Sequence, residues 1–181
     1  MKDLSLHILD ILQNSIFAEA KLIKVDIYDS NLSGTLKFTI SDDGKGMDDE
    51  ILNKITDPFY TTRTTRKVGL GIPLLKQNCE QTGGSLSIYS TINKGTSIEA
   101  LFYKNHFDML PLGDISGVIS LTFSSWSDID FEYSHKTDFG NYVLNTKEIK
   151  ETLENIPINN PQVIKFMKQM IEENLQEINA I

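Results

Sequence analysis

Residues Leu36 to Met47 read LKFTISDDGKGM, and the rest of the fold can be worked out from this stretch. Alternate residues from Leu36 to Ile40 are apolar, which is the period-two pattern of a half-buried strand. One further step of the alternation places Asp42 on the apolar face. A carboxylate that points toward a core is costly unless hydrogen-bond donors surround it. A structural turn explains Gly44 and Gly46, which allow close backbone approach, but it does not explain an inward aspartate.

The segment before this strand predicts a second strand and a long helix. Apolar and polar residues alternate from Ile23 to Tyr28, and apolar residues at helical spacing from about Asp3 to Ala20 predict a largely buried helix. Four polar residues of that helix fall in one sector about 60° wide: Asp3, His7, Asp10 and Asn14. This polar seam is either the solvent face of the helix or a row of groups that face a ligand.

Downstream of the strand, the pattern predicts short helices and two more strands. We expect helices from about Asp48 to Ile55 and from Ile72 to Gln81, and a strand through Leu86 and Ile88. In the stretch TSIEALF, Thr96 lies in register with the apolar residues that follow it. Its hydroxyl therefore needs a hydrogen-bond partner, as the carboxylate of Asp42 does.

Both arginines of the chain lie in the stretch TTRTTRKVGLGI, residues 61 to 72, although the chain has fifteen lysines. The planar guanidinium group suits phosphate oxygens, and a glycine-rich turn that leads into a helix N-terminus favours anions. Arg63, Arg66 and Lys67, beside Gly69-Leu70-Gly71, therefore indicate a mobile cover over a polyphosphate. A solvated basic loop is the alternative. The sequence contains no P-loop motif and neither the HRD nor the DFG motif of protein kinases.

Taken together, these stretches resemble the GHKL ATPase superfamily of gyrase, Hsp90, histidine kinases and MutL. The resemblance covers residues 3 to 103 and depends on motifs in the family's order. DILQNSIFA, residues 10 to 18, is similar to the N box, and DDGKGM, residues 42 to 47, to the first glycine box. DPFYTTR, residues 57 to 63, resembles the phenylalanine box, and GLGI, residues 69 to 72, the second glycine box. Gly95-Thr96 is similar to the final Gly-Thr pair.

The resemblance implies an ATP site with Mg²⁺ and assigns roles to particular residues. Asp42 would accept a hydrogen bond from the adenine amino group, with Thr96 near adenine, and Asn14 would supply an amide oxygen to Mg²⁺. Asp10 would stand at the general-base position, and Arg63 and Arg66 would act on the transferred phosphoryl group. The remaining cofactor-binding residues would be Gly44, Gly46, Met47, Lys67, Gly69, Leu70 and Gly71.

Three departures from the family pattern affect the functional interpretation. ATPases of the group usually have Glu where this chain has Asp10, which is about one methylene shorter and less suited to activating water. Lys67-Val68 replace the Gly-Thr that often precedes Gly-Leu-Gly in histidine kinases, which changes the lid. The phosphoacceptor box and dimerisation hairpin of a histidine kinase do not occur in this sequence, and His7 lies within the helix of the nucleotide site. We therefore expect a stand-alone ATP-binding domain whose phosphoacceptor is another protein.

The expected fold class is α+β. The resemblance implies a two-layer α/β sandwich with a mixed, mostly antiparallel sheet, the Bergerat ATP-binding fold, over residues 1–103. Residues 104–181 form a small C-terminal α+β extension of unknown role. The pattern of Ile115–Ser125 fits either a helix or a strand, and we favour a helix. The pattern also predicts a hairpin from Ile129 to Leu144, a helix after Asn145 and a last helix from Asn160-Pro161.

Composition excludes several other classes of function. The formal net charge is -8, with -2 on residues 1–102 and -6 on residues 103–181, so neither part suits nucleic acid. No apolar run is long enough to cross a bilayer, and the N-terminus lacks a signal-peptide cleavage site, so we expect a cytoplasmic protein. The single cysteine, Cys79, excludes an internal disulfide and is interpreted as a small core residue.

Two functions remain. The first is a kinase of histidine or serine type that transfers the γ-phosphoryl group of ATP to a partner protein. The alternative is an ATP-gated interaction module that hydrolyses ATP slowly. In either case the ligands are ATP and ADP, and a protein partner is expected.

If the arginines act on the phosphoryl group, the double variant Arg63→Ala, Arg66→Ala should lose more phosphoryl transfer than ADP affinity, because ADP lacks the group that these charges would stabilise. Turnover of ATP and calorimetric ADP binding measure the two quantities. Equal losses of both would mean that the arginines only support the fold.

Overall fold

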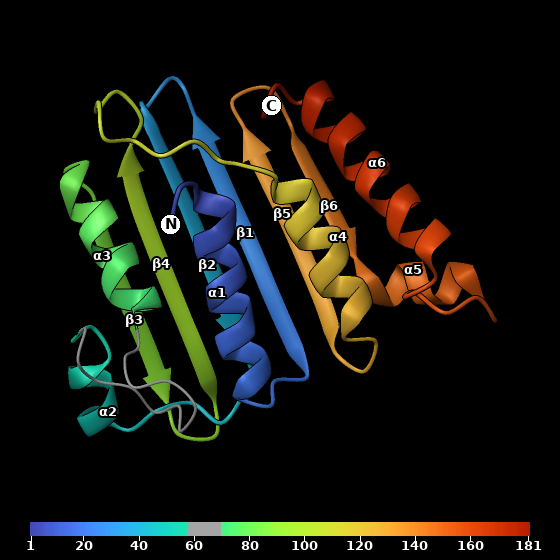
Figure 1. Ribbon diagram of the computed structural model, residues 1–181, viewed down its shortest axis with the longest axis horizontal. Helices are drawn as coiled ribbons and strands as arrows, with labels where there is room; N and C mark the ends of the chain where they lie inside the picture. The colour runs from blue at the N-terminus through green and yellow to red at the C-terminus, as the bar shows by residue number, and fades with distance from the viewer. Residues whose placement is uncertain (58–69) are drawn as a thin grey trace.

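A computed structural model describes residues 1–57 and 70–181 of the chain. In these residues, six strands form one sheet in the order β3-β4-β2-β1-β5-β6 (Figure 1). The strands are β1 (Leu22–Ser30), β2 (Thr35–Asp42), β3 (Ser85–Thr91), β4 (Gly95–Tyr103), β5 (Asp130–Thr137) and β6 (Asn141–Asn145). The helices are α1 (Leu4–Phe17), α2 (Asp49–Lys54), α3 (Gly71–Gln81), α4 (Ile115–Ser125), α5 (Thr146–Leu153) and α6 (Pro161–Glu177).

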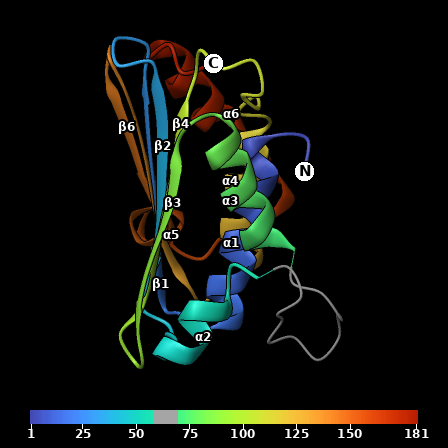
Figure 2. The same ribbon diagram turned by 90° about the vertical axis from the view of Figure 1, so that its left-hand side faces the viewer.

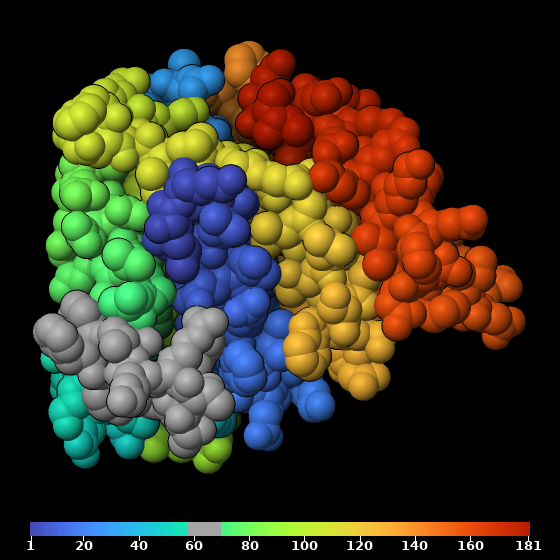
Figure 3. Space-filling view, viewed as in Figure 1, coloured from blue at the N-terminus to red at the C-terminus, as the bar shows by residue number. Residues whose placement is uncertain are grey.

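Four of the helices cover one face of this sheet. Figure 2 shows α1, α3, α4 and α6 on the same side, and the space-filling view of that side shows them next to one another from α3 to α6 (Figure 3). Among the strand pairs of the described residues, only β1 and β5 are parallel, and the other neighbours are antiparallel. The predicted two-layer sandwich with a mixed, mostly antiparallel sheet is therefore confirmed.

The alternation in β1 and β2 explains why the sheet has one covered face. Val25, Ile27, Phe38 and Ile40 are almost completely buried under the helices. The residues that alternate with these along each strand lie on the open face of the sheet. On that face, lysines pair with glutamates of neighbouring strands. The Nζ–Oε2 distance is 2.7 Å for Lys24–Glu132 and 3.1 Å for Lys37–Glu99.

Helix α1 is shorter than the predicted range of Asp3 to Ala20. Asp3 lies outside the helix as its N-cap, and its carboxylate accepts hydrogen bonds from Leu6 N–H and Ser5 Oγ. At the other end, Glu19 adopts a left-handed φ of 61° and Ala20 N–H donates back to the carbonyl of Ser15. A left-handed residue of this kind ends a helix, and periodicity alone does not reveal it.

The C-terminal residues continue the sheet of the N-terminal part. Strand β5 lies parallel to β1, with Asp130 opposite Leu22, and pairs with β6 as the predicted hairpin. The connector before α4 crosses the N-terminus of α1, where Leu4 N–H and Ser5 N–H donate to the carbonyls of Pro111 and Leu112. Two of the N–H groups that a helix start leaves unpaired are therefore satisfied by this connector.

The predicted elements of this region are confirmed with small shifts of their ends. Residues Ile115–Ser125 are helical, and Asp114 caps that helix by accepting from Gly117 N–H. Asn145 and Asn160 cap α5 and α6 through their side-chain oxygens, as their positions before each helix indicated.

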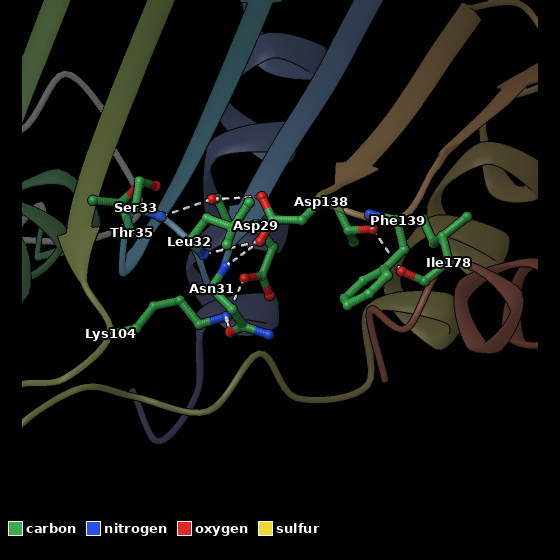
Figure 4. Close-up of polar contacts among 11 residues, drawn as sticks. Asp29, Asn31, Leu32, Ser33, Thr35, Lys104, Asp138, Phe139 and Ile178 are labelled. Atoms are coloured by element: carbon green, nitrogen blue, oxygen red, sulfur yellow. Dashed lines mark hydrogen bonds and ion pairs between the residues drawn. The ribbon is translucent and has the colours of Figure 1, made fainter.

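A group of polar contacts joins three turns at the end of the sheet where β1 leads into β2 (Figure 4). The carboxylate of Asp138 accepts from Ser30 Oγ at 2.7 Å and from the N–H groups of Asn31 and Leu32. Lys104 donates to Asp29 and Asn31. Because Asp138 belongs to the β5–β6 turn and Lys104 follows β4, the three segments are held together at this end.

Two further expectations can be compared with the described residues. Cys79 is fully buried, and burial raises the pKa of its thiol to about 12, as suits a small core residue. Among residues 1–57 and 70–181, no helix is both long and apolar enough to cross a membrane.

Two histidines are buried, and this makes stability depend on pH. His7 and His135 are at most 1% exposed, and burial lowers the pKa of each to about 4. One ring nitrogen of each lacks a hydrogen-bond partner in the described residues, Nδ1 of His7 and Nε2 of His135. Both side chains therefore fold as neutral imidazoles.

The free energy of unfolding should fall as pH drops from 6.5 toward 4, because the unfolded chain binds protons on these histidines before the folded chain does. The expected loss between pH 7.5 and 5.5 is about 1 kcal/mol for each histidine. Urea unfolding at the two pH values measures it. His7→Gln, which can still bond its neighbour but does not titrate, should remove about half of the difference. An unchanged difference would contradict the buried neutral state of His7.

Candidate functional site

The carboxylate of Asp42 lies at the end of β2, where it joins three elements. Its Oδ2 accepts from Ser15 Oγ of α1 at 2.7 Å. Its Oδ1 accepts from Gly44 N–H at 3.0 Å and from Thr96 N–H of β4 at 3.3 Å. The donors that a carboxylate on the covered face requires are thus present, and the side chain remains partly exposed. A partly exposed aspartate held at both oxygens can accept a further hydrogen bond from a ligand.

The glycines around Asp42 let two turns pack closely together. Gly46 and Gly95 have φ of 64° and 99°, which is the left-handed region that favours glycine. A Cβ on Gly46 would lie 2.0 Å from the carbonyl oxygen of Thr91, and a Cβ on Gly95 would lie 1.8 Å from that of Asp42. Any side chain at these positions would push the turn after β2 away from the β3–β4 turn.

Thr96 and Met47 are linked to this arrangement by Ser90. Thr96 lies opposite Asp42 in the β2–β4 register, and its Oγ1 is 2.9 Å from Ser90 Oγ. Met47 N–H donates to the same Ser90 oxygen at 2.8 Å. Ser90 therefore ties the predicted glycine box to the predicted Gly-Thr pair.

Sequence reasoning missed the two serines that complete the site, although both gave a signal. Ser90 continues the alternation of Leu86 and Ile88, so it lies in register with their inward face. Ser15 stands three residues after Leu12 on the apolar stripe of α1, where it is 3% exposed. A hydroxyl in either position needs a partner nearby.

Asp10 and Asn14 stand one helical turn apart on α1, and both side chains are partly exposed. The carboxylate of Asp10 lies against Gly71, the first residue of α3, since a Cβ there would be only 1.7 Å from Asp10 Oδ2. No described side chain caps α3, where Leu70 is half exposed. The N–H groups at a helix start and the helix dipole favour negative charge at this end.

The polar seam of α1 does not act as one unit. Asp3 caps the helix, and His7 is buried against α3 with its Nε2 2.8 Å from Asn78 Nδ2. Only Asp10 and Asn14 remain partly exposed at the end of α1 that leads to Ser15 and Asp42. His7 is therefore not placed as an exposed phosphoacceptor.

Part of the predicted site lies outside the described residues. Arg63, Arg66, Lys67 and Gly69 belong to residues 58–69, as does most of the predicted phenylalanine box. The structure places the other predicted residues in two groups. Asp10 and Asn14 of α1 lie toward the start of α3 with Leu70 and Gly71, and Asp42 lies at the end of β2 with Gly44, Gly46, Met47 and Thr96.

The oxygen donors on α1 suit Mg²⁺ bound together with a phosphate. Asn14 offers an amide oxygen and Asp10 a carboxylate, which are hard ligands of the kind that Mg²⁺ prefers. Within residues 1–57 and 70–181, no three His, Cys, Asp or Glu side chains form a cluster that could hold a metal ion. A magnesium ion held by one or two protein oxygens, with water and phosphate as its other ligands, fits this arrangement.

A mixed sheet with one covered face, with an aspartate and glycine turns at the end of its second strand, is the arrangement of a GHKL-type ATPase domain. The model of the family described as "Histidine kinase-, DNA gyrase B-, and HSP90-like ATPase" matches residues 2–105, more than half of the chain. The chain belongs to this family, as the sequence motifs indicated.

Its curated relatives include sensor proteins and kinases. The chain is 34% identical over 90 residues to a putative sensor protein of Shewanella frigidimarina, a match that covers 49% of this chain and 13% of that protein. It is 30% identical over 93 residues to sporulation kinase C of Bacillus subtilis, covering 51% and 22% of the two chains. The matched part is thus less than a quarter of each relative's length.

The fold also resembles a solved structure at low sequence identity. The crystal structure of the N-terminal domain of a DNA repair protein superposes with a TM-score of 0.56 and 18% identity, over 80% of this chain and 53% of that one. The part of this chain that superposes, 80%, is longer than residues 1–105, so the similarity in fold includes some of the C-terminal residues.

If Asp42 binds the adenine base, Asp42→Asn should weaken ADP binding at least about tenfold, because the side-chain amide presents a donor where adenine also donates. Isothermal calorimetry measures the affinity, and thermal melting shows whether the variant is folded. Asp26→Asn, which changes an exposed carboxylate in β1, is the matched control and should bind ADP normally. Normal ADP affinity in Asp42→Asn would show that adenine binds elsewhere.

Proposed function

We propose that this protein binds ATP with Mg²⁺ and transfers the γ-phosphoryl group to a side chain of a separate protein. The observation that supports this most directly is the partly exposed Asp42 carboxylate, held at both oxygens, in a member of this ATPase family. We also propose that the nucleotide-binding domain comprises residues 1–103, with residues 104–181 as an extension, and that the protein acts in the cytoplasm.

In this proposal the adenine lies beside Asp42 and Thr96. Asp42 accepts from the exocyclic amino group, and its bond from Ser15 fixes the direction of the carboxylate. Gly44, Gly46 and Met47 form the turn beside the base, and the glycines let this turn pack closely against the backbone of Ala18 and Thr91. A site that binds adenine through one defined acceptor discriminates against bases that lack a donor at that position.

The phosphates would lie between α1 and the start of α3. Asn14 would hold Mg²⁺, which neutralises phosphate charge when bound. The N–H groups at Leu70 and Gly71 begin a helix whose dipole favours the phosphates. Arg63, Arg66 and Lys67, together with Gly69, would close over the γ-phosphate and stabilise the charge of the transferred group.

Asp10 has a limited role in this proposal. Its carboxylate lies against Gly71, and an aspartate reaches less far than the glutamate usual in ATPases of the family. Direct activation of water is therefore disfavoured, which leaves the γ-phosphoryl group available for an acceptor with its own base. Catalysis would depend mainly on positioning and charge neutralisation.

The names of the relatives favour a kinase over a simple hydrolase, since they include sporulation kinase C. The buried position of His7 favours an acceptor on another protein. The second candidate is an ATP-gated interaction module. The short Asp10 side chain supports this candidate, because slow hydrolysis would keep ATP bound for longer.

The two functions can be separated with ATP labelled at the γ-phosphate and a lysate of the source cells. We expect the label to appear on another protein within minutes, and Asn14→Ala to abolish this transfer, because the metal would lose its protein ligand. Asp10→Asn should remove the slow hydrolysis that remains while transfer is kept, because only hydrolysis would need Asp10 as a base.

The same reaction without lysate is the control for hydrolysis and self-labelling. Release of free phosphate without labelled protein would support the interaction module and exclude the kinase. Full activity of Asn14→Ala would contradict the metal site as assigned.

A further inference from the structure

An apolar groove of about 510 Å³ lies at the edge of the sheet formed by β6, far along the strand order from the nucleotide site. Residues of β6, α5 and α6 line it, and these three elements lie at the same edge of the molecule in Figure 1. The side chains that line it are mostly apolar and include Leu144, Ile149, Phe166, Met167 and Met170. The volume is in the range of sites that bury a ligand or several side chains of a partner.

The edge of β6 offers main-chain hydrogen bonds beside this groove. Among the described strands, β6 pairs only with β5, so its other edge is open. Thr137 N–H bonds to the Gly140 carbonyl at the turn, and hydrogen-bonded pairs alternate along an antiparallel ladder. By this alternation, the backbone N–H and C=O groups that point away from β5 are those of Asn141, Val143 and Asn145.

Nothing in β6 blocks the addition of another strand. The sequence NYVLN contains no lysine and no proline, which are residues that commonly protect edge strands. Val143, at its centre, is 60% exposed, and Phe166 on the groove wall is 68% exposed. The exposed apolar side chains and the open backbone edge therefore lie side by side.

The charge around the groove is negative. Glu148 is the one charged residue among those that line it. Lys150 and Lys168 are already paired with Asp130 and Asp114. Lys147 and Lys165 of the flanking helices have no ion pair in the described residues. More glutamates than lysines are unpaired there: Glu148, Glu151, Glu154, Glu173 and Glu177. A basic segment is the complementary partner.

We propose that this groove binds an extended segment of a partner protein that alternates apolar and basic residues and adds as a seventh strand beside β6. Its backbone bonds to Val143 and its neighbours, and alternate apolar side chains enter the groove under α6, where the two methionines adapt to their shape. The basic residues lie on the other face of the added strand, and their charge complements the net charge of -6 on residues 103–181. A second copy of this chain is disfavoured as the occupant, because residues 103–181 carry a net charge of -6 in each copy.

The test uses the full chain and three short blocked peptides: alternating valine and lysine, alternating valine and glutamate, and the lysine peptide with alternate backbone nitrogens methylated. Fluorescence anisotropy measures binding of each labelled peptide. We expect the lysine peptide to bind at least about tenfold tighter than either of the others, since one lacks the complementary charge and the other cannot complete the ladder.

Two variants locate the binding. Val143→Pro removes an outward N–H group without breaking the β5–β6 ladder and should weaken binding of the lysine peptide at least about tenfold. Phe166→Ser should do the same by removing apolar contact. Tyr89→Ser, which changes a side chain of equal exposure, 68%, on the opposite edge strand β3, should have no effect.

Equal binding of the three peptides, or unchanged binding by Val143→Pro with its melting temperature retained, would overturn the proposal. A dimer in sedimentation that Val143→Pro dissociates would also overturn it, because the occupant would then be a second copy. The measurements require no nucleotide, so their failure would leave the proposed kinase activity unaffected.

Discussion

The carboxylate of Asp42 is the interaction on which the arrangement of the site depends. It accepts hydrogen bonds from α1, from the turn after β2 and from the start of β4, so three segments distant in sequence have one common partner. A carboxylate at this depth is tolerated because these donors satisfy it. The same bonds fix the direction of both carboxylate oxygens. In the proposed site, little conformational entropy would remain to be lost on binding a ligand.

The sequence was most informative where two levels of pattern agreed. The alternation through Leu36 and Ile40 predicted both the strand and the inward direction of Asp42, and the structure has both. The caps at Asn145 and Asn160 also followed from local signals, whereas the pattern of Ile115–Ser125 fitted either a helix or a strand and the structure has a helix there. The ends of α1 did not, because Asp3 and Glu19 act through backbone geometry that has no apolar period.

Long-range contacts were the part of the site that the pattern could not supply. Nothing local in the sequence indicates that Asp10 lies against Gly71, or that His7 bonds Asn78 instead of facing a ligand. These contacts depend on how α1 and α3 pack on the same face of the sheet. Ser15 and Ser90 are intermediate cases, since their inward direction could be read from the period but their partners could not. A polar residue at a position where the pattern expects an apolar one thus indicates a buried hydrogen bond. The partner in that bond is known only from the fold.

The parallel pairing of β1 with β5 also affects how the chain reaches this structure. Leu22 lies opposite Asp130, so one edge of β1 stays unpaired until a strand about a hundred residues further along the chain has been synthesised. Until then the N-terminal segment has an open strand edge in the middle of its future sheet, and such edges promote aggregation during synthesis. The final sheet can therefore close only after most of the chain has left the ribosome. Contacts such as those of Asp138 with the β1–β2 turn would then act late, fixing the two halves after they have paired.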